Sequence, residues 1–105
     1  MDMVRFYEHP DPKDVSLACV LFALSDPIRL EMVRVLANRG TVNSLELKPG
    51  MPKSTVSHHT RILRESGITN TRSEGRSCWI SLRRDLMDIR FPGLLDIILR
   101  DMGDI

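Results

Sequence analysis

The stretch that constrains this chain most is 51–67, MPKSTVSHHTRILRESG, because it predicts a helix with two unlike faces. At about 100° per residue, one face can pack on a core and carries Val56, His59, Thr60 and Leu63. The opposite face is polar and carries Ser54, Ser57, His58 and Arg61. Short hydroxyl side chains let a helix approach another surface closely, and His and Arg can reach base edges or phosphates beyond it. This pattern is typical of a helix that lies in the major groove of duplex DNA.

The chain resembles the ArsR/SmtB family of bacterial winged helix-turn-helix repressors in four segments, in the expected order. Residues 53–59 with 62–67 resemble the recognition helix, and 23–30 resemble the helix that precedes the reading head. Residues 73–76 are similar to the tip of the wing, and 80–83 to the strand that returns from it. The resemblance covers roughly residues 17–83. It implies an α+β, mostly helical winged helix-turn-helix fold with a two-stranded β-hairpin wing, dimerised through its first and last helices.

The 105 residues fit one domain, and 42% apolar with 28% charged residues is ordinary for a soluble globular protein. No apolar run reaches the roughly 18 residues that suggest a membrane span, and the N-terminal residues do not resemble a signal peptide. Cys19 and Cys78 are too few for a disulfide framework, so we expect a protein of the reducing cytoplasm.

The charge of the chain is unevenly distributed although its net value is only +1. Residues 48–84 hold eight Lys or Arg and two Glu, a net charge of +6, and the remaining residues carry −5. This asymmetry suits a polyanionic partner on one face. A solvated basic surface without a partner is the alternative.

Start and stop signals divide the chain into an N-terminal arm and a series of helices. Residues 1–10 form the arm, and the Asp11–Pro12 pair predicts a first helix to about Leu24. A second helix from Asp26–Pro27 to the Asn38–Gly40 stop carries an apolar stripe of Ile28, Met32, Val35 and Leu36. A short extended link at 41–42 and a third helix of one to two turns, capped by Asn43 or Ser44, should follow.

The second half of the chain contains the recognition helix, the wing and the last helix. The recognition helix spans 52–66, the wing 68–82 and the last helix 92–101, with a short helix or turn at 83–90. Two positions depart from the family pattern. Pro52 stands where the family usually has a capping Ser, and Thr60 stands where it favours Leu. We therefore expect a weaker cap and looser packing beneath the recognition helix.

The first and last helices are the most apolar of the predicted elements. A helix without a polar stripe must be buried on more than one side, and the resemblance implies that these two helices form a dimer interface. The interface residues we predict are Leu17, Val20, Leu21, Leu94, Leu95 and Ile98.

Residues on the recognition helix and the wing are the predicted DNA contacts. They are Lys53, Ser54, Thr55, Ser57, His58 and Arg61 on the helix, and Arg72 and Arg76 beside the wing tip. The two arginines are expected to contact phosphates or the minor groove.

No cofactor, metal or catalytic site is predicted. The adjacent His58 and His59 point about 100° apart. In metal-sensing members of the resembled family the ligands are Cys before the recognition helix, or acids and His in the last helix. Residues 43–50 hold no Cys, and 94–105 hold neither His nor Cys. No phosphate-binding glycine loop, nucleophile elbow or metal-hydrolase motif is present. The two cysteines need no role beyond packing, a thiol switch being the alternative.

These observations predict a homodimeric regulator that binds duplex DNA by sequence and represses by operator occlusion. The alternative is a winged helix that mediates protein–protein contact without sequence-specific DNA binding. The inducing signal is left open between a small molecule in the apolar crevice of the dimer, thiol oxidation and a change in protein amount.

Overall fold

A computed structural model describes residues 7–103 of the chain, so residues 1–6 of the predicted arm lie outside the described part. The helices are α1 (Leu17–Ala23), α2 (Pro27–Arg39), α3 (Lys53–Glu65), α4 (Arg84–Arg90) and α5 (Leu94–Asp101). The strands are β1 (Val42–Asn43), β2 (Thr69–Glu74) and β3 (Ser77–Leu82), and single 3-10 turns are η1 (Pro12–Asp14) and η2 (Ser44–Glu46). This is the winged helix-turn-helix architecture that the resemblance implies.

The three strands form one antiparallel sheet in the order β1-β3-β2. The wing is the β2–β3 hairpin, in which Glu74 pairs with Ser77 across a tight turn at Gly75. Gly75 adopts a positive φ of 58°, as the short turn requires. Residues 41–42 were expected as an extended link, but Val42 also pairs with Ile80 and adds a third strand. The hairpin prediction is therefore right, and the sheet is larger by one short strand.

The first helix is divided, which corrects the prediction of one helix from Pro12 to about Leu24. The Asp11 side chain caps only the η1 turn, by accepting from the Lys13 N–H. The chain then extends through Val15, whose side chain is buried in the core at 2% exposure. Ser16 starts α1 as a new cap, accepting from the Cys19 N–H at 3.1 Å. Burial of Val15 and the second cap explain why one continuous helix does not form.

The core lies where α2 packs against both α3 and the sheet. The inner face of α3 is as its periodicity predicts, since Val56, His59, Thr60 and Leu63 are its buried residues. On α2 the buried residues are Arg29, Met32, Val33 and Leu36, whereas the predicted Ile28 and Val35 are only partly buried. The buried arc of α2 is shifted because the helix meets neighbours on two sides.

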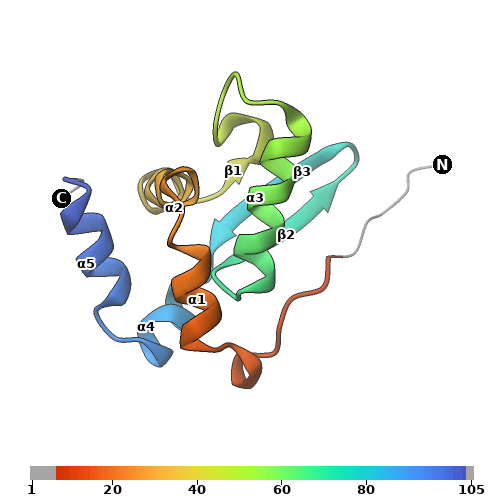
Figure 1. The fold of residues 1–105 in the computed structure, drawn as a ribbon. Coiled ribbons are helices and arrows are strands. Elements are labelled where there is room, and N and C mark those ends of the chain that lie inside the picture. The colour runs from red at the N-terminus through yellow and green to blue at the C-terminus, as the bar shows by residue number, and fades with distance from the viewer. Residues whose placement is uncertain (1–6, 104–105) are drawn as a thin grey trace.

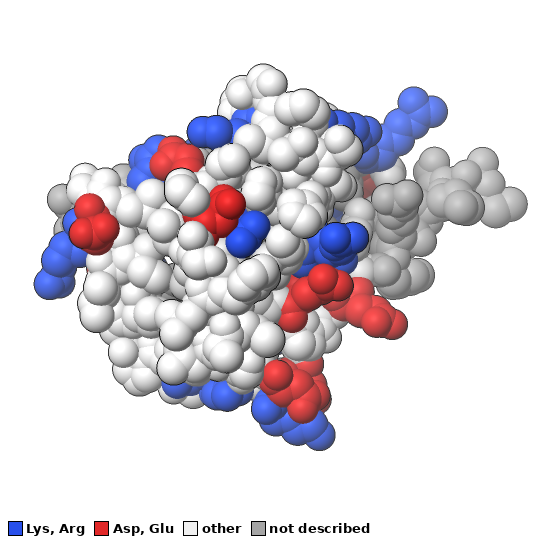
Figure 2. All heavy atoms as spheres, in the orientation of Figure 1, with Lys and Arg blue, Asp and Glu red and all other residues white. Residues whose placement is uncertain are grey.

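The two predicted functional surfaces lie apart in the molecule. Figure 1 shows α5 at the opposite end from the wing, with α3 in front of the β2–β3 hairpin. In the same orientation a broad area without charged side chains extends over α1 (Figure 2). The fold thus separates a polar reading head from an uncharged face.

Candidate nucleic-acid interface

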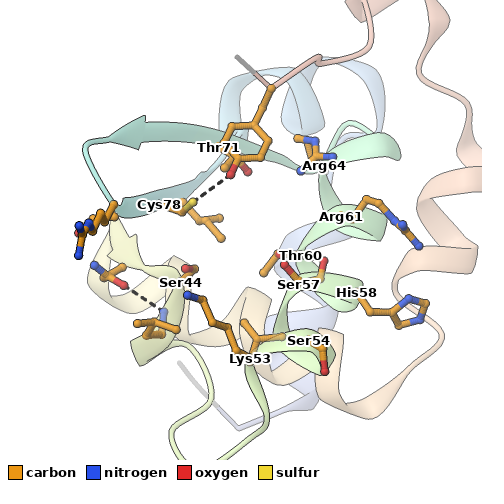
Figure 3. A pocket seen from close by; sticks show the side chains of 17 residues that line it. Ser44, Lys53, Ser54, Ser57, His58, Thr60, Arg61, Arg64, Thr71 and Cys78 are labelled. Atoms are coloured by element: carbon orange, nitrogen blue, oxygen red, sulfur yellow. Dashed lines mark hydrogen bonds between the residues drawn. The ribbon is translucent and has the colours of Figure 1, made fainter. Parts of the chain in front are cut away.

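The outward face of α3 presents the predicted polar row. The side chains of Ser54, Ser57, His58 and Arg61 are all exposed, whereas Thr55 is partly buried. Figure 3 shows His58 and Arg61 pointing to the side of α3 away from the wing. No side chain caps α3 at Pro52, so the weaker cap expected there is confirmed.

A cavity of about 580 Å³ lies between α3, the wing and the η2 segment. Figure 3 shows α3 along one side of it and Cys78 of the wing on the other, with Lys53 reaching into the space between. The cavity brings together most of the helix residues predicted to contact DNA. Those that line it are Lys53, Ser54, Ser57, His58 and Arg61.

The electrostatics of this cavity favour an anion. Four cationic side chains line it, and no Asp or Glu of the described residues does: the cations are Lys53, Arg61, Arg64 and Arg76. Arg61 forms an ion pair with Glu65 at 3.9 Å, and both side chains are more than half exposed. Such exposed pairs contribute only about 0–1 kcal/mol. This ion pair therefore does little to hold Arg61 in one position.

The two wing arginines do not lie on the same side of the hairpin. Arg76 stands at the turn and lines the cavity. Arg72 lies on β2 directly opposite Trp79, whereas the cavity-lining Thr71 and Cys78 belong to the alternate face. Arg72 also pairs with Glu74 at 3.4 Å. The structure thus brings Arg76, but not Arg72, to the cavity beside α3.

His59 anchors α3 from within rather than facing outward. Its Nδ1 lies 3.1 Å from Arg29 Nη1, and a guanidinium can only donate, so Nδ1 accepts and the ring is neutral. Burial lowers the pKa of His59 below its ordinary value, and Arg29 and His58 lower it further, against the opposing effect of Asp26. Partial burial of Asp26 raises its pKa, but hydrogen bonds from the Arg29 and Ile28 N–H groups bring the pKa below its ordinary value.

Three residues at this interface were missed by the sequence reasoning. His9, in the N-terminal arm, accepts a hydrogen bond at Nε2 from the Thr71 N–H at 2.9 Å. Tyr7 contacts Cys78 Sγ through its hydroxyl at 3.0 Å, and the Arg64 guanidinium lies 4.9 Å from the centroid of its ring. Helical spacing could have found Arg64, which follows Arg61 by three residues. The arm has no periodicity from which to infer its contacts.

The predicted dimer residues fall into two groups. Val20 and Leu95 are fully buried within this one chain, so their side chains fill its own core instead of its surface. Leu17 and Leu21 are about half exposed, at 47% and 49%, and Leu94 and Ile98 are partly buried. A helix that is apolar all round packs one side on the core of its own chain. Periodicity alone does not say which of its residues lie on that side.

Two further apolar residues of these helices, which the sequence did not single out, are also exposed. Phe22 at the end of α1 is 62% exposed, and Ile97 on α5 is 67% exposed. Cys19 on the same α1 is exposed, and Cys78 in the wing is partly buried. Within residues 7–103 no three or more His, Cys, Asp or Glu side chains are grouped to hold a metal ion. No helix in that range could span a bilayer.

The fold and the polar, cationic face of α3 define a winged helix-turn-helix protein of the class that binds duplex DNA. Residues 26–71 match the family model described as bacterial regulatory protein, arsR family. The HTH-type transcriptional regulator YceK of Bacillus subtilis (strain 168) is 36% identical over 84 residues, which cover 77% of this chain and 84% of that one. The chain belongs to the ArsR family and is a DNA-binding transcriptional regulator, not an enzyme.

Solved structures agree with this assignment. The transcriptional repressor BigR from Xylella fastidiosa superposes with a TM-score of 0.64 at 29% identity, covering 81% of this chain and 84% of that one. HlyU from Vibrio cholerae N16961 superposes with a TM-score of 0.67 at 21% identity, covering 82% and 90%. At that lower identity the likeness to HlyU concerns the fold alone.

Proposed function

We propose that the protein is a homodimeric repressor that occludes its operator, with one α3 of each subunit in successive major grooves. The observation that carries this proposal is the face of α3, where the exposed Ser57, His58 and Arg61 stand beside a cavity lined by four cations and, within residues 7–103, by no acid. Bases are read by such side chains, and phosphates are neutralised by the cations around them. Lys53, Ser54 and Thr55 at the start of α3 complete the proposed contact surface.

The wing is proposed to hold the flanking backbone. Arg76 lies at its tip on the cavity side, and Arg72 is exposed on the other face of the hairpin. The two arginines are placed to reach phosphates on either side of the wing, which would fix the register of α3 without reading sequence.

The second subunit is proposed to cover α1 and α5. Leu17, Leu21, Phe22 and Ile97 are all large, apolar and 47–67% exposed, and Figure 2 has no charged side chain over the α1 region. A soluble monomer rarely leaves such a surface open to water. A two-fold dimer through these helices would set the reading heads about 34–36 Å apart, one turn of DNA.

Repression, rather than activation, is supported by the likeness to BigR, which is a transcriptional repressor. We propose that the protein acts in the cytoplasm, because a DNA-binding regulator must share a compartment with its DNA. A small molecule that enters the crevice between the apolar helices of two subunits is our proposed signal, since apolar crevices of that kind are common ligand sites.

The experiment that tests this function is selection of bound sequences from a random pool of duplex DNA, followed by footprinting of the enriched site. We expect a two-fold symmetric sequence with half-sites one helical turn apart, bound far more tightly than random DNA. Failure to bind any duplex in a salt-dependent manner would contradict the proposal and favour a protein-binding winged helix.

A further inference from the structure

We propose that Arg64 binds an oxyanion in the cavity between α3 and the wing, that this oxyanion is a phosphate of the DNA backbone, and that Tyr7 positions Arg64 for it. The proposal rests on the DNA-binding function above and deepens it. It adds two residues, one of them from the N-terminal arm, to the interface predicted from the recognition helix and wing.

The arm is fixed to the edge of the sheet next to α3. β2 is an edge strand, and an edge leaves backbone N–H groups without a strand partner. His9 occupies one such position by accepting from the Thr71 N–H at 2.9 Å. The next residue of the arm, Pro10, accepts at its carbonyl from Arg83 Nη1 at 3.1 Å. These two contacts hold the arm beside the wing and determine where Tyr7 lies.

Tyr7 extends from this arm into the cavity and supports Arg64. Its hydroxyl is 3.0 Å from Cys78 Sγ, which fixes the outer end of the ring against the wing. The Arg64 guanidinium carbon lies 4.9 Å from the centroid of the same ring, within the range of a cation–π contact. Stacking on an aromatic ring holds a guanidinium in one plane and leaves its N–H edges available for a bidentate oxyanion.

One nitrogen of Arg64 has no hydrogen-bond acceptor among the residues that the structure describes. Its Nε is buried and has no hydrogen-bond partner in the part of the chain that the structure describes. The buried hydroxyl of Thr71, on the wall of the same cavity, is likewise unpaired within that part. Unpaired buried donors are costly. An oxyanion that enters the cavity as these side chains adjust would give the Nε of Arg64 the acceptor that it lacks.

The surroundings indicate where the oxyanion comes from. Lys53, Arg61 and Arg76 line the same cavity, so its potential suits a chain of phosphates better than a single small ion. The cavity is also bordered by Ser54, Ser57 and His58, the residues proposed to face the bases. A backbone phosphate would enter it when α3 lies in the major groove.

The first test measures binding of the selected operator and of random duplex by fluorescence anisotropy over a range of salt. For Arg64→Gln we expect about tenfold weaker binding of both DNAs and a salt slope lower by about one unit, as for one lost phosphate contact. Arg64→Lys keeps the charge, so it should keep the slope and lose less affinity. The matched control is Arg100→Gln, which removes an exposed cation from α5 and should change neither quantity.

The second test examines the positioning role by a double-mutant cycle. Tyr7→Ala should weaken binding in the wild-type background but have no further effect in Arg64→Gln, because the ring acts only through the guanidinium. Tyr7→Phe keeps the ring but loses the hydroxyl contact with Cys78, so it should weaken binding less than Tyr7→Ala does. Circular dichroism and thermal unfolding of each variant establish that the fold is retained.

The outcomes separate this inference from the function on which it rests. A wild-type protein that binds no duplex would refute the proposed function. A wild type that binds DNA while Arg64→Gln keeps the full salt slope would refute only the role of Arg64. Additive effects in the cycle would refute the role of Tyr7. If inorganic phosphate displaced DNA better than sulfate at equal ionic strength, and did so only when Arg64 is present, the site would belong to free phosphate and the DNA assignment would be wrong.

Discussion

His58 and Arg61 extend from the side of α3 away from the wing (Figure 3), and both are exposed; in the proposed complex they would face base edges. Replacing either residue by Ala should reduce sequence-specific binding by about 1–3 kcal/mol. The fold should be retained, because Arg61 loses only an exposed ion pair with Glu65. Anisotropy titrations with the operator and a scrambled duplex measure the difference. If both variants preserve the wild-type preference for the operator, another element reads the sequence.

His59 makes the stability of the protein depend on pH. Its pKa is held below the ordinary value of 6.5 by burial and by Arg29, so on acidification the unfolded chain binds its proton first. The protein should therefore have its full free energy of unfolding only above about pH 6.5, where His59 is neutral in both states. That free energy should decrease as the pH falls below this value. Burial and Arg83 also lower the pKa of His9, so His9 should likewise make the protein less stable at low pH.

Urea unfolding of the wild type and of His59→Gln at pH 8 and pH 5.5 measures this effect. Gln cannot titrate but can still accept from Arg29, so the loss of stability at low pH should be smaller in the variant. A loss as large as that of the wild type would mean that other groups cause the pH dependence.

The junction of α3 with the wing depends on a glycine at the end of the helix. Gly67 has a φ of 91°, and a Cβ placed there would come within 2.5 Å of Val15 Cγ2. Gly67→Ala should therefore cost about 1–3 kcal/mol from backbone strain and a similar amount from overpacking. Gly40→Ala is the matched control, because Gly40 also has a positive φ, of 82°, but its Cβ would meet nothing within 4 Å.

Urea unfolding of the two glycine variants separates the two causes, since only Gly67→Ala should show the larger loss. Equal destabilisation would mean that Val15 moves aside without cost. The same measurement tests whether the buried Val15, which divides the first predicted helix, also fixes the end of α3.

At the scale of elements, the sequence was most informative where one periodicity dominated. The two faces of α3 followed from spacing alone, because a helix packed on one side keeps its polar residues on the other. The hairpin followed from its turn residues. By contrast, Val15 turned inward and ended the first helical segment early, an effect of tertiary packing that local start signals cannot reveal.

The candidate site was predictable only in part, for a similar reason. Residues on one helix share a face by geometry, so Ser57, His58 and Arg61 could be grouped from their numbers. The contacts of Tyr7 with Cys78 and of His9 with Thr71 join residues more than sixty positions apart. No local pattern encodes such pairs. Nor could spacing decide that Val20 and Leu95 would face the core of their own chain.

For the whole molecule, the exposed apolar face predicts the oligomeric state. A charge introduced at Leu21 or Ile97, as in Leu21→Glu or Ile97→Glu, should prevent dimerisation, because each side chain would be buried in the proposed interface. Light scattering at micromolar concentration should give a dimer for the wild type and a monomer for the variants, which should lose the symmetric footprint. A wild type that is monomeric under these conditions would contradict the proposed assembly.

Arg29 joins this outer face to the reading head. Its guanidinium donates to the carbonyls of Phe22 and Ala23 at the end of α1, at 3.4 and 2.7 Å, and contacts His59 of α3 at 3.1 Å. Because one rigid planar group contacts both helices, a tilt of α1 would be expected to move α3 as well. In a dimer built on α1, the angle between subunits would then set the separation of the two α3 helices against the helical repeat of DNA. A ligand that rotates the subunits would then weaken binding of an operator that requires one fixed spacing. By thermodynamic reciprocity, the operator would weaken binding of that ligand by the same factor.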